Sequence, residues 1–197
     1  TEADGSLGQP ALEALGAARS LNAARPGSTL VAGLIGEIVQ AAASRIAGCG
    51  AARFLGVAGA EFAQSRYATD AAAAEALCKT SGATIVIAPG TSRFARCLAG
   101  VAQRVGGRAD THVTAVSVQG DKIAVNRWYY RQRMEAVLQR SQRPWFMLLD
   151  PGSQPVWQDE AGSAIVESVT VTLSDSAQRT RVMGLREPAA DAQTIRP

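Results

Sequence analysis

The first half of the chain alternates between short apolar runs and longer stretches in which apolar residues recur at helical spacing. The apolar runs, typical of buried strands, span residues 29–35, 53–59 and 84–88. The helix-like stretches span residues 10–21, 37–46, 70–79 and 92–105. Thr69 or Asp70 is placed to cap the third of these helices. Strands that alternate with helices across short turns predict an α/β fold, a three-layer α/β/α Rossmann-like domain with a mostly parallel sheet.

The second half of the chain is dominated by strand patterns. They span residues 111–118, 122–130, 134–139 and 145–149, and a last one spans 165–173. Polar turns such as 119–121 separate the first of them, so we expect an antiparallel β extension of the parallel sheet. Residues 186–197 carry two prolines and few apolar side chains. We therefore predict one domain over residues 1–185 and a linker or tail over 186–197.

The start of the chain departs from the usual order of such a domain. A doubly wound sheet normally opens with a strand, whereas this chain opens with a polar turn at residues 2–6 and then a helix. Either the first strand is missing from this chain, or the sheet begins with a later element.

Composition narrows the class of protein. Apolar residues make up 47% of the 197 residues and the mean hydropathy is +0.01, so a core can form and general disorder is excluded. No apolar run approaches the ~20 residues that span a bilayer, so we expect no membrane insertion. The net charge of +3 is too small to indicate nucleic acid by itself.

The cysteines and the basic residues suggest where the protein works. Alanine makes up about a fifth of the chain, far above average usage, and Lys79 and Lys122 are its only lysines; this pattern suits a GC-rich bacterial genome. Three cysteines without a Cys-x-x-Cys spacing indicate neither a metal site nor a disulfide framework. The first residues, polar with two acids, do not have the pattern of a signal peptide, and we expect a reducing, cytoplasmic location. We expect Cys78 and Cys97, on helical patterns, to be buried packing residues.

Candidate sites for catalysis and nucleotide binding are few. Gly33 and Gly36 follow a strand and open a helix, and Pro89-Gly90 follows another strand, so these four residues are candidates for a nucleotide cleft. The third glycine of the dinucleotide fingerprint and the lysine of a P-loop are both absent, and close strand–helix packing explains the glycines more simply. His112, the only histidine, is better explained as a surface or hydrogen-bonded strand residue than as a general base. We therefore predict no catalytic residues.

Basic and aromatic residues are concentrated in one segment. Six of the ten aromatic residues lie between Trp128 and Trp157, interleaved with arginines. Such a cluster fits single-stranded nucleic acid, or a β-ribbon whose rings pack on the sheet, or a protein interface, for which Tyr, Trp and Arg are the typical hot-spot residues. We favour a partner interface, with no nucleic acid, formed by Arg127, Trp128, Tyr130, Arg131 and Arg133.

Read in order, the segments resemble the amino-terminal domain of the electron transfer flavoprotein alpha subunit. The resemblance runs from about Gly5 to Val182, and no single motif decides it. The matching segments are Asp4–Leu7 with the helix at 11–18, the strand at 30–33, the strand at 84–89 that ends in Ala-Pro, the Asp-x-x-x-Thr-Ala run at 110–116, the Arg-Trp-Tyr-Tyr run at 127–130, and the strand and turn at 143–155.

The chain also departs from the family pattern in places. After Ala88-Pro89 the family usually has Thr-Thr-x-Gly followed by a basic residue, whereas this chain has Gly-Thr-Ser-Arg-Phe-Ala-Arg at 90–96. The family's Pro-Arg is replaced at Ala99-Gly100, and its Gly-Asn after the tyrosine is replaced at Gln132-Arg133. We expect the family's first strand to lie before Thr1. The Ser-Gly-Gly-Arg-Gly motif that opens the flavin-binding domain is absent, so the chain is expected to carry the scaffold half of such a protein.

The resemblance implies a function. The chain would pair with an electron transfer flavoprotein beta subunit and support FAD-mediated electron transfer, with a flavin-dependent dehydrogenase or a quinone oxidoreductase as redox partner. It would be an electron carrier subunit rather than an enzyme. FAD would bind in the assembled flavoprotein rather than to this chain alone, and AMP could bind to the partner subunit. The alternative is an adenine-nucleotide-binding domain like those of universal stress proteins, because both families share an adenine-nucleotide-hydrolase-like fold.

Overall fold

The helices and strands follow the alternation that the sequence predicts. The computed structural model describes residues 1–2, 4–158 and 161–184. Its helices are α1 (Gln9–Ala23), α2 (Gln40–Arg45), α3 (Tyr67–Ser81), α4 (Ser92–Arg104) and α5 (Asp175–Gln178), with 3-10 turns η1 (Ala47–Cys49) and η2 (Ala60–Phe62). Its strands are β1 (Val31–Gly36), β2 (Arg53–Ala58), β3 (Ile85–Pro89), β4 (Arg108–Gln119), β5 (Lys122–Tyr129), β6 (Met134–Gln139), β7 (Trp145–Leu149) and β8 (Val166–Ser168).

The strands form two hydrogen-bonded sheets. One has the order β1-β2-β8 and is entirely parallel. The other has the order β3-β7-β4-β5-β6, in which β3, β7 and β4 are parallel while β5 and β6 continue the sheet as antiparallel strands. Within the part of the chain that the structure describes, no strand pairing joins β1 to β3.

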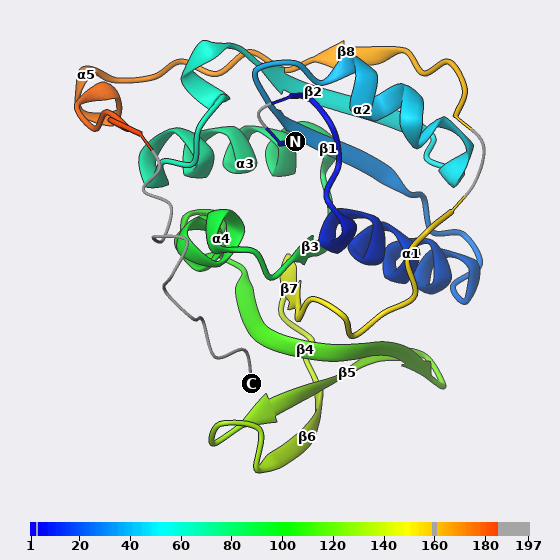
Figure 1. The fold of residues 1–197 in the computed structure, drawn as a ribbon. Helices are drawn as coiled ribbons and strands as arrows, with labels where there is room; N and C mark the ends of the chain where they lie inside the picture. The colour runs from blue at the N-terminus through cyan, green and yellow to red at the C-terminus, as the bar shows by residue number, and fades with distance from the viewer. Residues whose placement is uncertain (3, 159–160, 185–197) are drawn as a thin grey trace, which may run out of the picture.

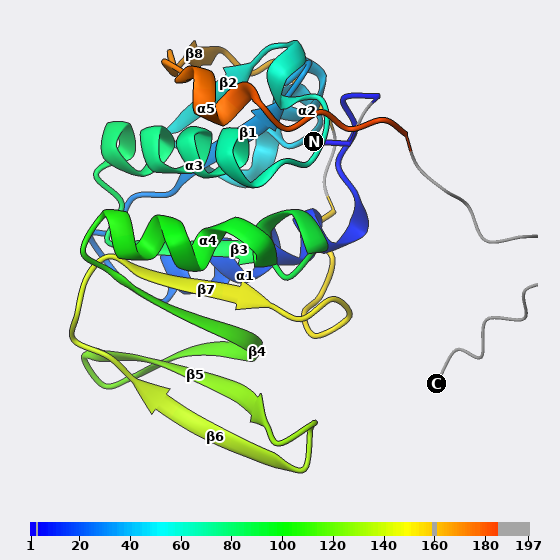
Figure 2. The ribbon, with the colours of Figure 1, turned by 90° about the vertical axis from the view of Figure 1, so that its left-hand side faces the viewer.

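Helices cover both faces of the strands. In Figure 1, α3 and α4 lie on one side and α1 and α2 on the other; turned by 90°, α3 and α4 lie in front of the strands in Figure 2. The hairpin of β5 and β6 forms the end of the molecule farthest from β8 in both views. The three-layer α/β arrangement, with a mostly parallel sheet and an antiparallel extension, is confirmed.

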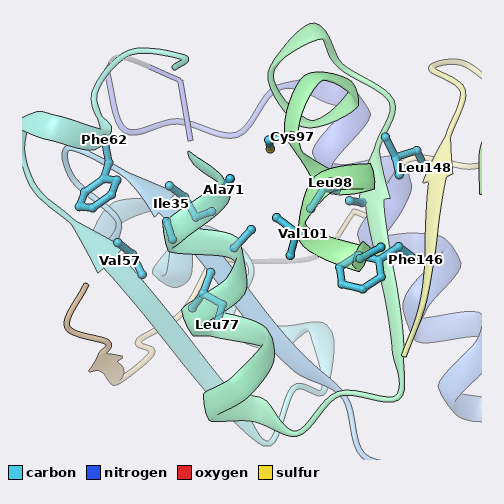
Figure 3. Close-up of a cluster of buried hydrophobic side chains, with 14 of the residues drawn as sticks. Ile35, Val57, Phe62, Ala71, Leu77, Cys97, Leu98, Val101, Phe146 and Leu148 are labelled. Carbon is cyan, nitrogen blue, oxygen red and sulfur yellow. The ribbon is translucent and has the colours of Figure 1, made fainter. Parts of the chain in front are cut away.

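Strand β7 shows how the layers are held together. Trp145, Met147 and Leu149 pack into the cluster that contains residues of α1, while Phe146 and Leu148 pack into the cluster that contains residues of α3 and α4. All five are buried. Figure 3 shows the second cluster, in which Phe146 and Leu148 lie beside Leu98 and Val101 of α4. Alternate side chains of one strand therefore build the core on each face, as the two-residue period of a strand requires.

Three sequence predictions need correction. The helix predicted over 37–46 is only the six residues of α2, and the strand predicted over 165–173 is only the three residues of β8. The third helix begins two residues before Thr69, so neither Thr69 nor Asp70 caps it; Arg66 occupies the N-cap position, and the Asp70 carboxylate accepts a hydrogen bond from its backbone N–H at 3.1 Å. The predicted tail over 186–197 lies outside the described residues.

Candidate interface hairpin and the carboxyl ends of the strands

The β5–β6 hairpin ends in a strained tip. Tyr130, Arg131 and Gln132 follow β5 with φ angles of 48°, 56° and 64°, the left-handed region that residues with a Cβ rarely adopt. The backbone N–H of Arg133 closes the turn by donating to the Tyr129 carbonyl at 3.2 Å. Strain of this kind persists only where the surrounding structure fixes it, and it is commonest at functional positions.

The tip exposes both apolar and basic side chains. Tyr130 is 74% exposed, and Met134 and Val137 of β6 are more than half exposed. Arg131 and Arg133 are also exposed. Large apolar residues interspersed with arginine have the composition of a protein interface. The structure thus places Tyr130, Arg131 and Arg133, three of the five predicted interface residues, together on one accessible edge.

A buried carboxylate anchors the base of this hairpin. Asp110 of β4 accepts hydrogen bonds from Arg127 Nη1 of β5 at 3.0 Å, from Arg140 Nη2 at 2.8 Å and from Trp145 Nε1 of β7 at 2.8 Å. Arg140 Nε also donates to it. Burial acts to raise the pKa of Asp110, but the hydrogen bonds from Arg140 and Trp145 and the two guanidinium charges outweigh it and hold that pKa below its usual value. The Asp110 cluster therefore joins β4, β5 and β7 to the residue that follows β6.

The other two predicted interface residues serve different roles. Arg127 points to Asp110, its guanidinium lies 4.3 Å from the centre of the Tyr129 ring, and its side chain is only 17% exposed. Trp128, on the opposite face of β5, is half-buried and lines a pocket of about 500 Å³ with Thr114, Gln132 and residues 150–153. Arg127 therefore ties the hairpin to β4 through Asp110, and Trp128 lines a pocket beside the hairpin tip.

The aromatic–basic cluster divides between core and surface. Trp145, Phe146 and Trp157 are buried, and Tyr129 is half-buried beneath Arg127. Only Tyr130 among the six clustered rings is strongly exposed. A binding platform for single-stranded nucleic acid needs several accessible rings in succession. The described residues do not provide one here.

His112 lies at an irregularity of β4, near the same edge. Its φ is 56°, and the pairing of β4 with both neighbouring strands shifts register on either side of it. The exposed imidazole Nδ1 is 3.2 Å from a carboxylate oxygen of Asp150, which follows β7. The prediction of a surface, hydrogen-bonded strand histidine is confirmed.

Three of the four cleft candidates, Gly36, Pro89 and Gly90, lie at the carboxyl ends of β1 and β3. Gly33 lies inside β1, where a Cβ would be 3.3 Å from Leu77 of α3. A Cβ on Gly36 would collide with the side chain of Thr1, and one on Gly90 would lie 2.6 Å from the Leu149 carbonyl. The Gly90 N–H already donates to that carbonyl at 2.7 Å, and Pro89 has no N–H. The glycines permit close packing, and Pro89 and Gly90 offer a phosphate no free N–H group.

A second buried ion pair, which the sequence pattern did not suggest, holds the carboxyl edge together. Arg93 Nη2 donates to Asp70 at 2.6 Å and to the Phe62 carbonyl at 2.6 Å, and Arg93 Nη1 donates to the Thr1 carbonyl at 3.3 Å. The Asp70 side chain is 1% exposed and that of Arg93 is 13% exposed. One guanidinium thus links the start of α4 to α3, to η2 and to the first residue of the chain. The sequence signal that could have indicated this pair is the aspartate, Asp70, in the first turn of an Ala-rich helix.

The thiols and carboxylates show no further chemistry in the described residues. Cys49, Cys78 and Cys97 are free thiols. Burial raises the pKa of Cys78 and of Cys97 to about 11, so both are protonated thiols at neutral pH. Cys97 is buried in the core, which confirms its prediction as a buried packing residue, whereas Cys78 packs against the same core but is only partly buried. No group of three or more His, Cys, Asp or Glu residues that could hold a metal ion occurs in the described part of the chain.

Comparison with known proteins gives one family. A family model described as "Electron transfer flavoprotein domain" matches residues 1–174. No curated protein matched the sequence. None of the helices in the described ranges has the length and apolar character needed to cross a membrane.

Proposed function

This chain belongs to the electron transfer flavoprotein domain family, and from that premise we propose that it is the amino-terminal scaffold domain of an alpha subunit. Proteins of this family are electron carriers rather than enzymes, and they bind FAD in the assembled flavoprotein. In the proposed role the chain pairs with a beta subunit and supports a flavin held elsewhere in the complex. That flavin passes electrons between a flavin-dependent dehydrogenase and an acceptor such as a quinone oxidoreductase.

The β5–β6 hairpin is the observation that best supports a scaffold role. It exposes Tyr130, Arg131, Arg133 and Met134 at its tip, while Arg127 and Arg140 tie its base to the buried Asp110. A contact surface that is ordered before binding loses less side-chain entropy when a partner arrives. The hairpin therefore suits a stable subunit interface, with Tyr130 and Arg131 as the main contacts.

The candidate cleft argues for placing the flavin outside this chain. FAD carries a pyrophosphate, which proteins usually bind through free backbone N–H groups at a glycine-rich turn. The Gly90 N–H is bonded to the Leu149 carbonyl, and Thr1 fills the space beside Gly36. The residues present at these strand ends do not fit a pyrophosphate, and no step of electron transfer is assigned to them. When bound in the complex, the flavin itself supplies the redox chemistry.

Co-expression with the beta subunit from the same source tests this proposal. The two chains should co-purify as a complex with flavin absorbance near ~375 and ~450 nm once the flavin-binding part is included. Tyr130→Ala and Arg131→Ala should each weaken the complex at least about tenfold, because exposed Tyr and Arg dominate interface energetics. Lys122→Ala, an exposed basic residue at the opposite end of β5, is the matched control and should leave the affinity unchanged.

Three other outcomes would contradict parts of the proposal. An intact complex with folded Tyr130→Ala and Arg131→Ala chains would show that the hairpin tip is not the contact surface. If the chain pairs with an alpha subunit and not with a beta subunit, it is itself a beta subunit. Saturable micromolar binding of AMP to the isolated chain, measured by calorimetry, would favour an adenine-nucleotide-binding domain like those of universal stress proteins.

A further inference from the structure

The pocket beside the hairpin tip has no role in the function proposed above. This tip pocket has a volume of about 500 Å³ and is lined by Thr114, Trp128, Gln132 and residues 150–153. In Figure 2 the loop that follows β7 and the turn between β5 and β6 lie on the same side of the molecule. The tip pocket therefore lies where β7 ends, and ligands of open α/β sheets usually bind outside the carboxyl ends of the strands.

An irregularity of β4 forms one side of the tip pocket. Val113 and Ala115 pair with consecutive residues of β5, so Thr114 between them is an extra residue on β4. Such a β-bulge bends its strand and re-aims a side chain, and bulges are common beside functional sites. His112 and Gln132 have φ angles of 56° and 64°, so strained backbone lies on both sides of the tip pocket.

The charge around the tip pocket is negative. Asp150 lines it, and two further carboxylates lie one hydrogen bond from its lining residues. Glu135 accepts from Thr114 Oγ1 at 3.0 Å, and Glu13 accepts from the Gly152 N–H at 2.7 Å. Within the part of the chain that the structure describes, no arginine or lysine forms an ion pair with any of these three carboxylates.

Two of these carboxylates have only weak compensation for their charge. Glu13 is 2% exposed, and its second hydrogen-bond donor is the neutral amide of Gln9 at 2.8 Å. Asp150 lies 3.2 Å from Nδ1 of His112, an imidazole that carries a charge only when protonated. A buried carboxylate without a cation is costly. A positive group in the tip pocket would therefore be favoured.

Trp128 contributes an aromatic face to the same pocket. The Arg143 guanidinium lies 5.7 Å from the centre of the Trp145 ring. That of Arg45 lies 6.0 Å from the centre of the Trp157 ring. Among the described residues no cation lies over Trp128 in this way. Trp is the aromatic residue that attracts cations best, and the planar, weakly hydrated guanidinium stacks on it more readily than an ammonium does.

We propose that the tip pocket binds a guanidinium group, which stacks on Trp128 and donates hydrogen bonds to Asp150. The Ser153 Oγ atom is buried and has no hydrogen-bond partner within the described ranges, so it is available as a further acceptor. A free guanidinium compound and an arginine side chain of a partner chain both present this chemistry. The site itself does not depend on the subunit assignment.

An anion does not suit the tip pocket. The Gly152 N–H already donates to Glu13, the Ser153 N–H donates to the Asp150 carbonyl at 3.2 Å, and Pro151 has no N–H. No arginine or lysine is among its lining residues. A phosphate or carboxylate ligand would therefore meet the Asp150 charge without a compensating donor.

Two amino acid amides test the requirement for a positive charge. N-acetyl-arginine amide and N-acetyl-citrulline amide have nearly the same shape, but citrulline carries a neutral urea in place of the guanidinium. The arginine compound should shift the backbone amide NMR signals of Thr114 and Ser153 and the indole signal of Trp128, with a dissociation constant on the order of 1 mM. The citrulline compound should bind at least about tenfold more weakly. Equal affinities, or shifts confined to other surfaces, would overturn the proposal.

Substitutions assign the two contacts. Asp150→Asn keeps the shape of the side chain and should weaken binding of the arginine compound at least about tenfold. Asp121→Asn removes the same charge from an exposed turn and should leave the affinity unchanged. Trp128→Leu should weaken binding about threefold. Undiminished binding to a folded Asp150→Asn chain would overturn the proposal. If that variant does not fold, the comparison with citrulline on the unmodified chain decides.

The complex with a beta subunit distinguishes the two sources of the guanidinium. If an arginine of the partner fills the tip pocket, the complex should no longer bind the arginine compound. Asp150→Asn should then weaken the complex at least about tenfold, and Asp121→Asn should not. Unchanged binding of the arginine compound to the complex would identify a free compound as the source. If no beta subunit pairs with the chain, the proposed function fails, whereas the guanidinium site still stands or falls with the arginine and citrulline titrations.

Discussion

Asp110 shows how one buried carboxylate can control the order of a surface hairpin. Its pKa is held below the usual value by Arg140, Trp145 and Arg127, despite burial. A carboxyl whose pKa is lower in the folded state stabilises the protein above its unfolded pKa of about 3.9, and this stabilisation is lost as the pH falls through the folded value. Denaturant melts should therefore show little loss from this group between pH 7 and pH 5, and a steep loss below about pH 4.

The matched substitutions separate this group from other acids. Asp110→Asn should lower the free energy of unfolding by about 3 kcal/mol at pH 7, because it leaves Arg127 and Arg140 without their charge partner. The variant should also lose less stability than the original chain as the pH falls below about 4, because the titrating carboxyl is gone. Asp121→Asn, on the exposed turn between β4 and β5, should change stability by less than about 0.5 kcal/mol. Equal stability of the two variants at pH 7 would mean that the Asp110 cluster does not hold the hairpin.

Arg93 is the second residue whose loss should be felt throughout the fold. It donates to Asp70, to Phe62 and to Thr1, and Asp70 is almost fully buried. Arg93→Met keeps the length of the side chain but leaves the Asp70 carboxylate unpaired, so chemical denaturation should show a loss of about 3 kcal/mol. Arg96→Met, one turn later on α4 and exposed, is the control and should cost under about 0.5 kcal/mol. A loss of the same size for both would point to a general effect of removing positive charge from α4.

At the scale of the elements, the hairpin tip holds strain that a glycine would relieve. Gln132 has a φ of 64° and an exposed side chain. Gln132→Gly should raise the free energy of unfolding by about 1 kcal/mol, because glycine adopts this conformation without a steric penalty. Gln139→Gly, in the extended part of β6, should lower it by about 1 kcal/mol. A stability loss in both variants would mean that the tip residue makes contacts worth more than its strain.

The sequence predicts the elements best where burial acts on every residue. The strand over 145–149 has the predicted bounds because it is an unbroken apolar run that is buried throughout, and the more exposed strand over 134–139 has its predicted bounds as well. The helix at 37–46 and the strand at 165–173 were overextended because their patterns are shared by neighbouring loops that pack on the same core, as Val169 and Val171 do. The inward direction of Arg127 could not be read from its neighbours, because its partner Asp110 is 17 residues away.

At the scale of the whole molecule, a three-stranded and a five-stranded sheet lie in one fold without a strand pairing between β1 and β3 in the described residues. Helices α3 and α4 pack together on one face, and the Arg93 contacts bridge the carboxyl edge. The sequence predicted both layers and a missing or later first strand. The division into two sheets could not be predicted, because strand order comes from contacts between residues that are distant in sequence. Stability of the whole domain should be sensitive to the chemical state of Thr1, because this residue is hydrogen-bonded to both Ile35 of β1 and Arg93 of α4.

The amine of Thr1 makes that sensitivity measurable. Burial and Arg93 lower its pKa from 8.0 to about 6, against the smaller opposing effects of Glu2 and Asp70. The folded chain therefore binds fewer protons than the unfolded chain between these values, so this group's stabilisation is complete above pH 8 and lost as the pH falls to 6. In the 197-residue chain, the contribution should amount to about 2 kcal/mol across this window. Acetylation of Thr1 removes the titrating amine and keeps an N–H for the Ile35 carbonyl. Subtracting the denaturation curve of the acetylated chain from that of the unmodified chain isolates this group, because all other titrating residues are shared. A flat difference between pH 6 and 8 would mean that the amine is solvated and does not make its buried hydrogen bond to the Ile35 carbonyl.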